Sequence, residues 1–332
     1  MKSFYFTCGD VNGIGPEIVI KSLNRIKFTN DRKIIFICPD NVFKEIIKKT
    51  HPKFSYSVID NYKASEPGKL NLITLPDIPI KKGEATKHSG RTSFLSIKYA
   101  FECLSNDNSS ALITSPISKN AFKLAGVNYK GHTDLLADWC GVKNYLMTFL
   151  SKRMNAALST IHIPLNKVSE SITQKKLLTQ INIISDLLKN DLGISTPSIA
   201  LLGLNPHAGE EGIIGNEEQK VLTPVVNGLK TKLSISGPFS PDAFFAASMY
   251  KKYDLVFGMY HDQVLIPFKM LNFSSGANFT AGLPIVRTSP DHGTAYDIAW
   301  QNKADESSMM QSFYYANKIL VNRLKNEADK KS

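Results

Sequence analysis

Apolar and polar positions alternate along the chain in a way that predicts an α/β protein. Short apolar runs at residues 3–9, 33–39, 110–117 and 198–206 have the length of buried strands. Each is followed by apolar residues at helical spacing, at 16–26, 40–50, 118–126 and 216–232. A fifth run, 254–261, precedes a short segment and the apolar run 277–289. This order favours a largely parallel sheet covered by helices.

Two segments depart from this rhythm. Residues 147–163, "MTFLSKRMNAALSTIHI", contain two strand-like runs that meet at Ser151, Lys152 and Arg153, which predicts a β-hairpin and hence a mixed sheet in the middle of the chain. Residues 306–331 have a long amphipathic pattern. We expect them to form a helix that packs back onto the N-terminal part.

Length and composition narrow the class of protein. A chain of 332 residues with 42% hydrophobic content is long enough for two domains. Its beginning has too few apolar residues for a signal peptide, and no uncharged apolar run approaches the roughly 18–20 residues of a membrane span. We therefore expect a cytoplasmic protein with no membrane partner. The four cysteines are widely separated and are expected to be buried free thiols: Cys8, Cys38, Cys103 and Cys140.

The formal net charge of +11 raises the question of a nucleic-acid partner. The lysines are spread over predicted helix surfaces rather than gathered with aromatic residues into one stripe, so we expect no nucleic-acid partner. A positive field equally suits an anionic small substrate.

Three histidines follow three of the predicted strands. His162 ends the run "ALSTIHI", His207 follows "IALLGLNP", and His261 follows "DLVFGMY". Ligands of open α/β sheets bind outside the carboxyl ends of the strands, so these imidazoles could converge. Three neutral imidazoles with one open position suit a catalytic divalent metal such as zinc. The alternative is that each histidine caps its strand or bonds a backbone carbonyl, because polar residues are common at strand ends.

Several loops contain residue types that bind anions. "GDVNGIGPE" has two glycines and a Pro16 suited to start a helix, and "TSPISK" at 114–119 is a similar loop; both fit either a phosphate-binding loop or a simple strand-to-helix turn. "KGHTD" places His132 and Thr133 at a predicted helix N-terminus, where free N–H groups favour an anion. The alternative there is an ordinary N-cap by Thr133.

Two cations and an amide follow the third histidine: Lys269, Asn278 and Arg287. A planar guanidinium suits a carboxylate or a phosphate, and Arg287 follows the apolar run "AGLPIV", which argues against an open surface. "DHGTAYDIA" at 291–299 is a polar, glycine-containing turn that opens a helix.

Taken together, these motifs resemble those of the 4-hydroxythreonine-4-phosphate dehydrogenase family. "GIGPE", "TSPISK", "GHTD", "GLNPHAGE", "YHDQ", "GLPIVRTS" and "DHGTA" occur in that family's order and spacing, from about residue 7 to residue 300. The resemblance implies a fold similar to isocitrate and isopropylmalate dehydrogenases, with two α/β/α domains, mixed, largely parallel sheets and an interdomain cleft. We place the cofactor-side domain at 1–125 plus 292–332, and the metal, substrate and dimerisation domain at 126–291.

The resemblance also implies an activity and a set of site residues. The family oxidises 4-phosphooxy-L-threonine with NAD or NADP and a divalent metal, Zn²⁺ or alternatively Mg²⁺ or Co²⁺. The product, 2-amino-3-oxo-4-phosphooxybutanoate, loses carbon dioxide to give 3-amino-2-oxopropyl phosphate in vitamin B6 biosynthesis. The enzyme is a homodimer whose active site and metal are shared across the subunit interface.

Carried over by motif, the residues are assigned as follows. The metal ligands are His162, His207 and His261, and the substrate contacts are His132, Thr133, Lys269, Asn278 and Arg287. The candidates for the general base are Asp242 and Lys269, and the cofactor-binding turn consists of His292, Gly293, Thr294 and Ala295.

The chain departs from the family pattern at a few positions. Asp10, Val11 and Asn12 replace the usual Asp-Pro-Ala, "HDQVLIPFK" rearranges a glycine and a proline, and Trp300 replaces a glycine beside the cofactor turn. Three alternatives stay open: a dehydrogenase of threonate or erythronate 4-phosphate, a metal-dependent phosphohydrolase, and a basic nucleic-acid-binding protein.

Overall fold

The computed structural model describes residues 1–105, 107–273 and 275–330. The chain divides into two compact units. Unit 1 consists of Met1–Gly141 and Leu283–Leu324, and unit 2 consists of Val142–Gly282 with the end of the chain from Lys325. Unit 1 is therefore built from two separate stretches of sequence.

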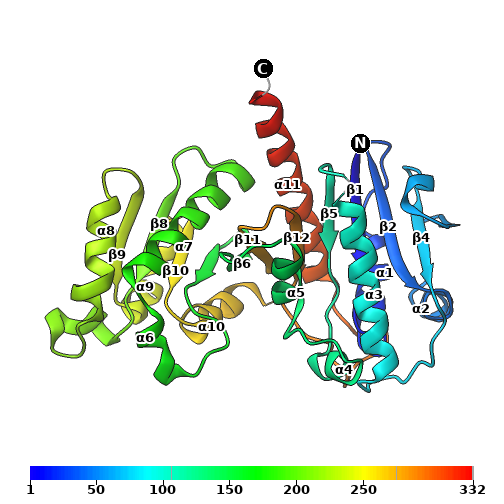
Figure 1. Ribbon diagram of the computed structural model, residues 1–332, viewed down its shortest axis with the longest axis horizontal. Helices are drawn as coiled ribbons and strands as arrows, with labels where there is room; N and C mark the ends of the chain where they lie inside the picture. The colour runs from blue at the N-terminus through cyan, green and yellow to red at the C-terminus, as the bar shows by residue number, and fades with distance from the viewer. Residues whose placement is uncertain (106, 274, 331–332) are drawn as a thin grey trace. The chain divides into compact units, whose positions relative to one another are not determined.

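Unit 1 contains six parallel strands in the order β3-β4-β2-β1-β5-β12. The strands are β1 (Lys2–Thr7), β2 (Arg32–Pro39), β3 (Tyr56–Ile59), β4 (Leu70–Leu75), β5 (Ser110–Ile113) and β12 (Val286–Pro290). The helices are α1 (Gly15–Leu23), α2 (Asp40–Thr50), α3 (Lys87–Leu104), α4 (Lys119–Leu124), α5 (His132–Trp139) and α11 (Ser307–Asp329). In Figure 1, α3 lies in front of this sheet and runs nearly along its strands, and it packs against β1, β2 and β5.

Strand β1 shows why helices cover both faces of this sheet. Successive side chains of a strand point to opposite faces. The rings of Phe4 and Phe6 lie 5.0 and 6.0 Å from Phe313 of α11, whereas Tyr5 contacts Cys103 of α3. All three β1 side chains are at most 1% exposed, so the sheet is buried on both sides, as continuous apolar runs predict. The expected packing of the C-terminal helix onto the N-terminal part is confirmed; residue 331 of that prediction lies outside the described residues.

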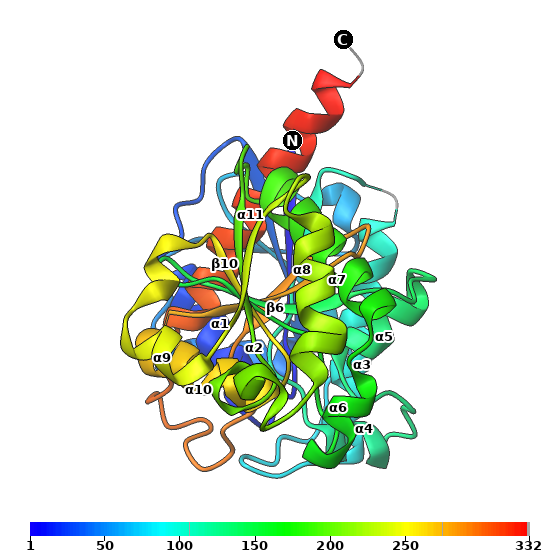
Figure 2. The same ribbon diagram turned by 90° about the vertical axis from the view of Figure 1, so that its left-hand side faces the viewer.

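Unit 2 contains a mixed sheet in the order β11-β6-β7-β10-β8-β9. The strands are β6 (Leu146–Leu150), β7 (Ala156–Leu158), β8 (Ser198–Leu202), β9 (Ser234–Phe239), β10 (Leu255–Gly258) and β11 (Ala277–Ala281). The helices are α6 (Val168–Ser171), α7 (Gln174–Asp186), α8 (Thr223–Leu229), α9 (Pro241–Ala246) and α10 (His261–Asn272). In Figure 2, α9 and α10 lie on one side of this sheet and α7 and α8 on the other.

The predicted hairpin is confirmed, because β6 and β7 pair antiparallel with Phe149 opposite Ala156. Strand β11 also runs antiparallel to β6, whereas β7, β10, β8 and β9 are parallel. The carboxyl ends of β7, β10 and β8, adjacent in the sheet, therefore meet at one edge. The expected α/β class, with parallel and mixed sheets between helices, is confirmed.

Three local predictions need correction. The short segment expected after the run 254–261 is occupied by α10, a 12-residue helix that begins at His261 and contains Pro267. The run 277–289 forms two strands, β11 and β12, in different units, separated at Gly282. All four cysteines are free, and Cys8, Cys38 and Cys103 are buried, but Cys140 is half-exposed.

Among the described residues, none of the helices has both the length and the apolar character needed to cross a lipid bilayer.

Candidate functional site

Arg287 is a deeply buried cation of unit 1. It lies on β12 opposite Leu112 of β5 and is only 2% exposed. Its Nε and Nη2 atoms donate to Thr114 Oγ1 at 3.0 and 2.7 Å, just beyond the end of β5. Burial lowers the pKa of Arg287 to about 9, which leaves it charged at neutral pH. Thr114, in the "TSPISK" loop, was not among the predicted site residues, although that loop was recognised.

His132 lies in the electrostatic field of this guanidinium. It is the first residue of α5, whose N-cap is Gly131, so the alternative of an N-cap by Thr133 is wrong. Burial of the ring, and then the charge of Arg287, hold the pKa of His132 well below its ordinary value of 6.5. The residue keeps some exposed surface, but its Nε2 atom is buried and has no hydrogen-bond partner among the described residues. A neutral imidazole beside a cation can donate this N–H to an anion.

The neutral state of His132 predicts a specific pH dependence. The unfolded chain binds a proton at this histidine more readily than the folded protein does, since the folded pKa lies below 6.5. The stability from neutral His132 is therefore present above about pH 6.5 and lost as the pH falls below it. We therefore expect the free energy of unfolding to fall less between pH 6.5 and pH 5 in His132→Asn than in wild type, as measured by denaturant unfolding between pH 5 and 8. An NMR titration that gives wild-type His132 a pKa at or above 6.5 would contradict this.

The predicted cofactor turn lies against the first loop of unit 1. The backbone N–H of Ile14 donates to the Thr294 carbonyl at 3.0 Å, and a Cβ on Gly13 would lie 2.7 Å from the same oxygen. A Cβ on Gly293, by contrast, would meet no atom within 4 Å. The backbone at Gly293 is therefore open to a ligand, so this turn fits the approach of a nucleotide.

Val11 and Trp300, which depart from the family pattern, and Asp10, which matches it, form contacts beside this turn. Asp10 is buried and accepts hydrogen bonds from Tyr296 Oη at 2.8 Å and from the N–H of Asn12 at 3.0 Å; burial raises its pKa. Trp300 has a left-handed backbone (φ 65°), a conformation that favours the glycine it replaces. Its indole is 3% exposed and donates to the Val11 carbonyl at 3.0 Å, so these replacements contact each other.

In unit 2, two of the three predicted metal ligands come together. The rings of His162 and His261 lie 5.7 Å apart between centroids, at the edge where β7 and β10 end. His261 Nδ1 is 2.6 Å from Asp262 Oδ1, an arrangement that orients the ring. Both histidines line an open cavity of about 240 Å³, together with Thr160, Ile163, Leu165, Val168, Tyr260 and Asp262.

His207 follows β8 at the same edge of the sheet but lies on a separate loop. Within the described residues of the single chain, no three ligating side chains lie close enough together to hold a metal. His207 is near Asp242 of α9, whose pKa is lowered first by the hydroxyl of Ser240 and slightly by His207. The imidazole pair thus fits part of a metal site. His162 and His207 both have φ of 51°, and such strained conformations cluster at functional sites.

A buried carboxylate holds the loop that carries His207. Five successive residues, 207–211, have left-handed backbone angles, each of which costs about 1–2 kcal/mol for an L-residue other than glycine. Glu218, 3% exposed, accepts the N–H groups of Leu204 and Asn205 at 2.7 and 2.8 Å, and a Cβ on Gly209 would lie 2.6 Å from its Oε2. The sequence did not reveal Glu218, because a glutamate in a helix-like pattern looks the same as one on a solvated face.

Removing this carboxylate should disorder the His207 loop. We expect Glu218→Ala to lower the free energy of unfolding by about 3 kcal/mol, because two buried N–H groups lose their acceptor. Glu218→Gln, which keeps an acceptor oxygen, should lose much less. Denaturant unfolding measures the stability, and hydrogen exchange of residues 203–212 measures the loop. Equal exchange in wild type and Glu218→Ala would refute the anchoring role.

The remaining predicted residues also lie in unit 2. Lys269 lies on α10 and is exposed, and Asn278 lies on β11 opposite Phe149 of β6. Asn278 Oδ1 is buried and has no hydrogen-bond partner among the described residues. The structure therefore brings His132 near Arg287, and His162 near His261, each pair within one unit.

Known proteins resemble this chain over nearly its full length. The family model of the pyridoxal phosphate biosynthetic protein PdxA matches residues 30–316. The 4-hydroxythreonine-4-phosphate dehydrogenase of Sulfurihydrogenibium sp. (strain YO3AOP1) is 39% identical over 326 residues, or 98% of this chain and 100% of the relative. The D-threonate 4-phosphate dehydrogenase of Salmonella typhimurium is 36% identical and covers 95% of this chain and 98% of its own.

A solved structure agrees with these sequence relatives. The crystal structure of 4-hydroxythreonine-4-phosphate dehydrogenase from Klebsiella pneumoniae superposes with a TM-score of 0.83 at 35% identity, over 96% of this chain and 98% of that one.

Proposed function

The chain belongs to the family of the pyridoxal phosphate biosynthetic protein PdxA, as its motifs predicted, and on that premise we propose that it oxidises 4-phosphooxy-L-threonine. It is an oxidoreductase, so the comparisons favour a dehydrogenase over a phosphohydrolase. The proposed product is 2-amino-3-oxo-4-phosphooxybutanoate, which loses carbon dioxide to give 3-amino-2-oxopropyl phosphate. This reaction belongs to vitamin B6 biosynthesis, and we place it in the cytoplasm.

The observation that carries this proposal is the proximity of His132 to the buried Arg287. A buried guanidinium and a neutral imidazole with an unsatisfied Nε2 are suited to the phosphate of the substrate. Thr133, at the start of α5, adds helix N–H groups without intrahelical partners. Lys269 and Asn278 of unit 2 remain proposed substrate contacts. Binding energy from the phosphate would help to position the reacting carbon.

The nicotinamide cofactor, NAD or NADP, would be held by His292, Gly293, Thr294 and Ala295. The open backbone at Gly293 supports this assignment. When bound, the cofactor accepts the hydride of the substrate's secondary alcohol. Trp300 and Val11, two positions that depart from the family pattern, contact each other beside this turn, on the proposed adenosine side.

We further propose a divalent metal, Zn²⁺ or alternatively Mg²⁺ or Co²⁺, held by His162, His207 and His261. When bound, it would supply Lewis-acid stabilisation at the substrate hydroxyl. His162 and His261 already face each other, and Asp262 orients the second ring. His207, which lies apart from them, is consistent with a site completed across a subunit interface.

A homodimer is part of this proposal, supported by the surface of α10. Ile266, Met270 and Phe273, at its C-terminal end, are 58%, 81% and 96% exposed and recur at helical spacing. Large apolar side chains exposed together on one helix face mark a protein interface. The helix that begins with His261 would thus also carry the dimer contact.

Two residues of unit 2 remain candidates for the general base. Asp242 is exposed, and hydrogen bonds from Ser240 and from the N–H of Ala243 lower its pKa, so it is ionised and able to accept a proton at neutral pH. Lys269 is the alternative.

A second candidate substrate comes from the relatives, because a D-threonate 4-phosphate dehydrogenase is nearly as similar as the 4-hydroxythreonine-4-phosphate dehydrogenases. The test is to compare kcat/KM for 4-phosphooxy-L-threonine and D-threonate 4-phosphate. We expect the former to be preferred at least tenfold. A preference for D-threonate 4-phosphate would contradict this choice of substrate and leave the dehydrogenase assignment intact.

A further inference from the structure

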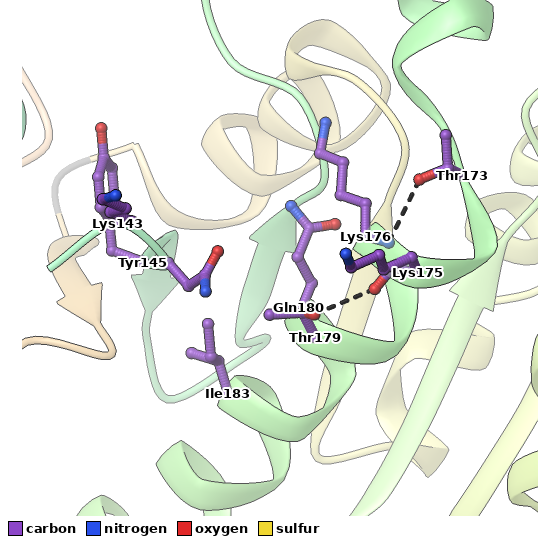
Figure 3. Close-up of a pocket in the computed structure, with 9 residues that line it drawn as sticks. Lys143, Tyr145, Thr173, Lys175, Lys176, Thr179, Gln180 and Ile183 are labelled. Atoms are coloured by element: carbon purple, nitrogen blue, oxygen red, sulfur yellow. Dashed lines mark hydrogen bonds between the residues drawn. The ribbon is translucent and has the colours of Figure 1, made fainter.

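Unit 2 contains a second, larger cavity that the proposed reaction does not use. It has a volume of about 340 Å³ and lies between the first turns of α7 and the chain that leads into β6 (Figure 3). The residues that line it are Lys143, Asn144, Tyr145, Thr173, Lys175, Lys176, Thr179, Gln180 and Ile183. The volume falls in the range of small-molecule sites, which is about 300–1,000 Å³.

The charge of this cavity has one sign. Three of its lining residues, Lys143, Lys175 and Lys176, are cations, and none of the nine is a carboxylate. Lys176 is half-buried, and its Nζ donates to the carbonyl oxygen of Ser171 at 3.2 Å, a neutral acceptor. Burial lowers the pKa of Lys176, which means that the fold disfavours its charge. An anion in the cavity would offset that cost, because a nearby opposite charge favours the charged form.

The N-terminus of α7 adds to this positive field. Thr173 is the N-cap, and its hydroxyl accepts the N–H of Lys176 at 3.3 Å (Figure 3). The N–H groups of the preceding helical residues, Gln174 and Lys175, have no intrahelical partner, and the dipole of a 13-residue helix favours a negative charge here. Lys175 and Lys176 thus line the helix wall of the cavity beside these backbone donors, whereas Lys143 lies on the opposite wall (Figure 3).

The wall of the cavity is fixed by a buried amide. Gln180, 8% exposed, donates from Nε2 to the Ser159 carbonyl at 2.9 Å and accepts the Ser159 hydroxyl on Oε1 at 2.8 Å. Ser159 directly follows β7, three residues before His162. The helix face that carries Lys176 and Gln180 is therefore held against the end of the strand that leads to the proposed metal ligand.

We propose that this cavity is a separate binding site for a small phosphorylated anion. Three ammonium groups with a helix N-terminus match a phosphate, whose charge at neutral pH is about −1.5 to −2, better than a single carboxylate. The site is independent of the proposed substrate contacts, since none of its lining residues belongs to that set.

The test measures binding of inorganic phosphate and of methyl phosphate, by calorimetry at constant ionic strength and by hydrogen exchange. Arg287→Met supplies the background, so that the proposed substrate site does not contribute. In that background we expect both anions to protect residues 173–180. Replacing Lys175→Gln and Lys176→Gln together should weaken binding at least tenfold. The matched control replaces Lys230→Gln and Lys232→Gln, two exposed lysines of the same unit outside the cavity, and should change nothing.

Binding of inorganic phosphate alone would identify the free ion as the ligand, and tighter binding of methyl phosphate would identify a phosphate ester. Two results would overturn the proposal. One is that chloride at the same concentration protects residues 173–180 as well as phosphate does; the other is that phosphate binds with the same affinity whether or not Lys175 and Lys176 are replaced. These outcomes are independent of the dehydrogenase activity.

Discussion

Replacing Arg287 by methionine should lower kcat/KM for 4-phosphooxy-L-threonine by roughly 10²- to 10³-fold. In the proposed complex, Arg287 and the substrate phosphate form a buried charge pair, and removing one partner of such a pair costs about 2–5 kcal/mol. Each 1.36 kcal/mol in the activation free energy changes the rate by a factor of ten. Arg287 is 2% exposed and anchored to Thr114, so no water-exposed cation can take its place. Methionine is apolar and unbranched and can fill much of the buried volume, which separates loss of the phosphate contact from loss of packing.

Two further variants sharpen this test. Arg287→Lys keeps the charge but loses the planar fork, and should retain only part of the activity. Arg91→Met removes the same charge from an exposed position of α3 and should leave the kinetics unchanged. If the Arg287 variants lost no more activity with the phosphorylated substrate than with unphosphorylated 4-hydroxy-L-threonine, the proposed phosphate contact would be wrong.

Replacing His261 by alanine should remove bound metal and lower turnover by roughly 10³-fold or more. Lewis-acid stabilisation by a metal contributes several kcal/mol, which corresponds to that factor. His162→Ala should have the same effect, because the two rings face each other at 5.7 Å. Elemental analysis of the purified protein gives the metal content independently of activity.

The control for this experiment is His88→Ala, an exposed histidine on α3 of unit 1, which should keep both metal and turnover. The double replacement of His162 and His261 should be no worse than either single one, since each alone breaks the same site. Wild-type metal content in the single variants would remove both histidines from the ligand set.

The sequence predicted the parts of the fold that repeat a strong pattern. Continuous apolar runs identified β1, β2, β5, β8 and β10, and the two runs around Ser151 identified the hairpin. Strand β3, whose side chains alternate between exposed and half-buried, has no such run and was not predicted. Helix α10 was missed because Pro267 interrupts its pattern; burial of Val264, Leu265 and Phe268 stabilises a helix that propensity alone would not predict.

The candidate site divides in the same way. The sequence already indicates that each of three histidines follows a strand: His162, His207 and His261. Because β7, β10 and β8 are parallel neighbours, these three strand ends lie at one edge of the sheet. Loop geometry, including the left-handed backbone at His207, decides that only His162 and His261 approach each other. Such angles come from tertiary contacts, among them those of Glu218, and a single sequence carries no local signal for them.

The most direct test of the central claim is an initial-rate assay of reduced nicotinamide formation with 4-phosphooxy-L-threonine, NAD or NADP, and Zn²⁺, Mg²⁺ or Co²⁺. The account predicts an absorbance increase that disappears when the substrate, the nucleotide or the metal is omitted. No increase with any phosphorylated four-carbon acid, either nucleotide and all three metals would contradict it.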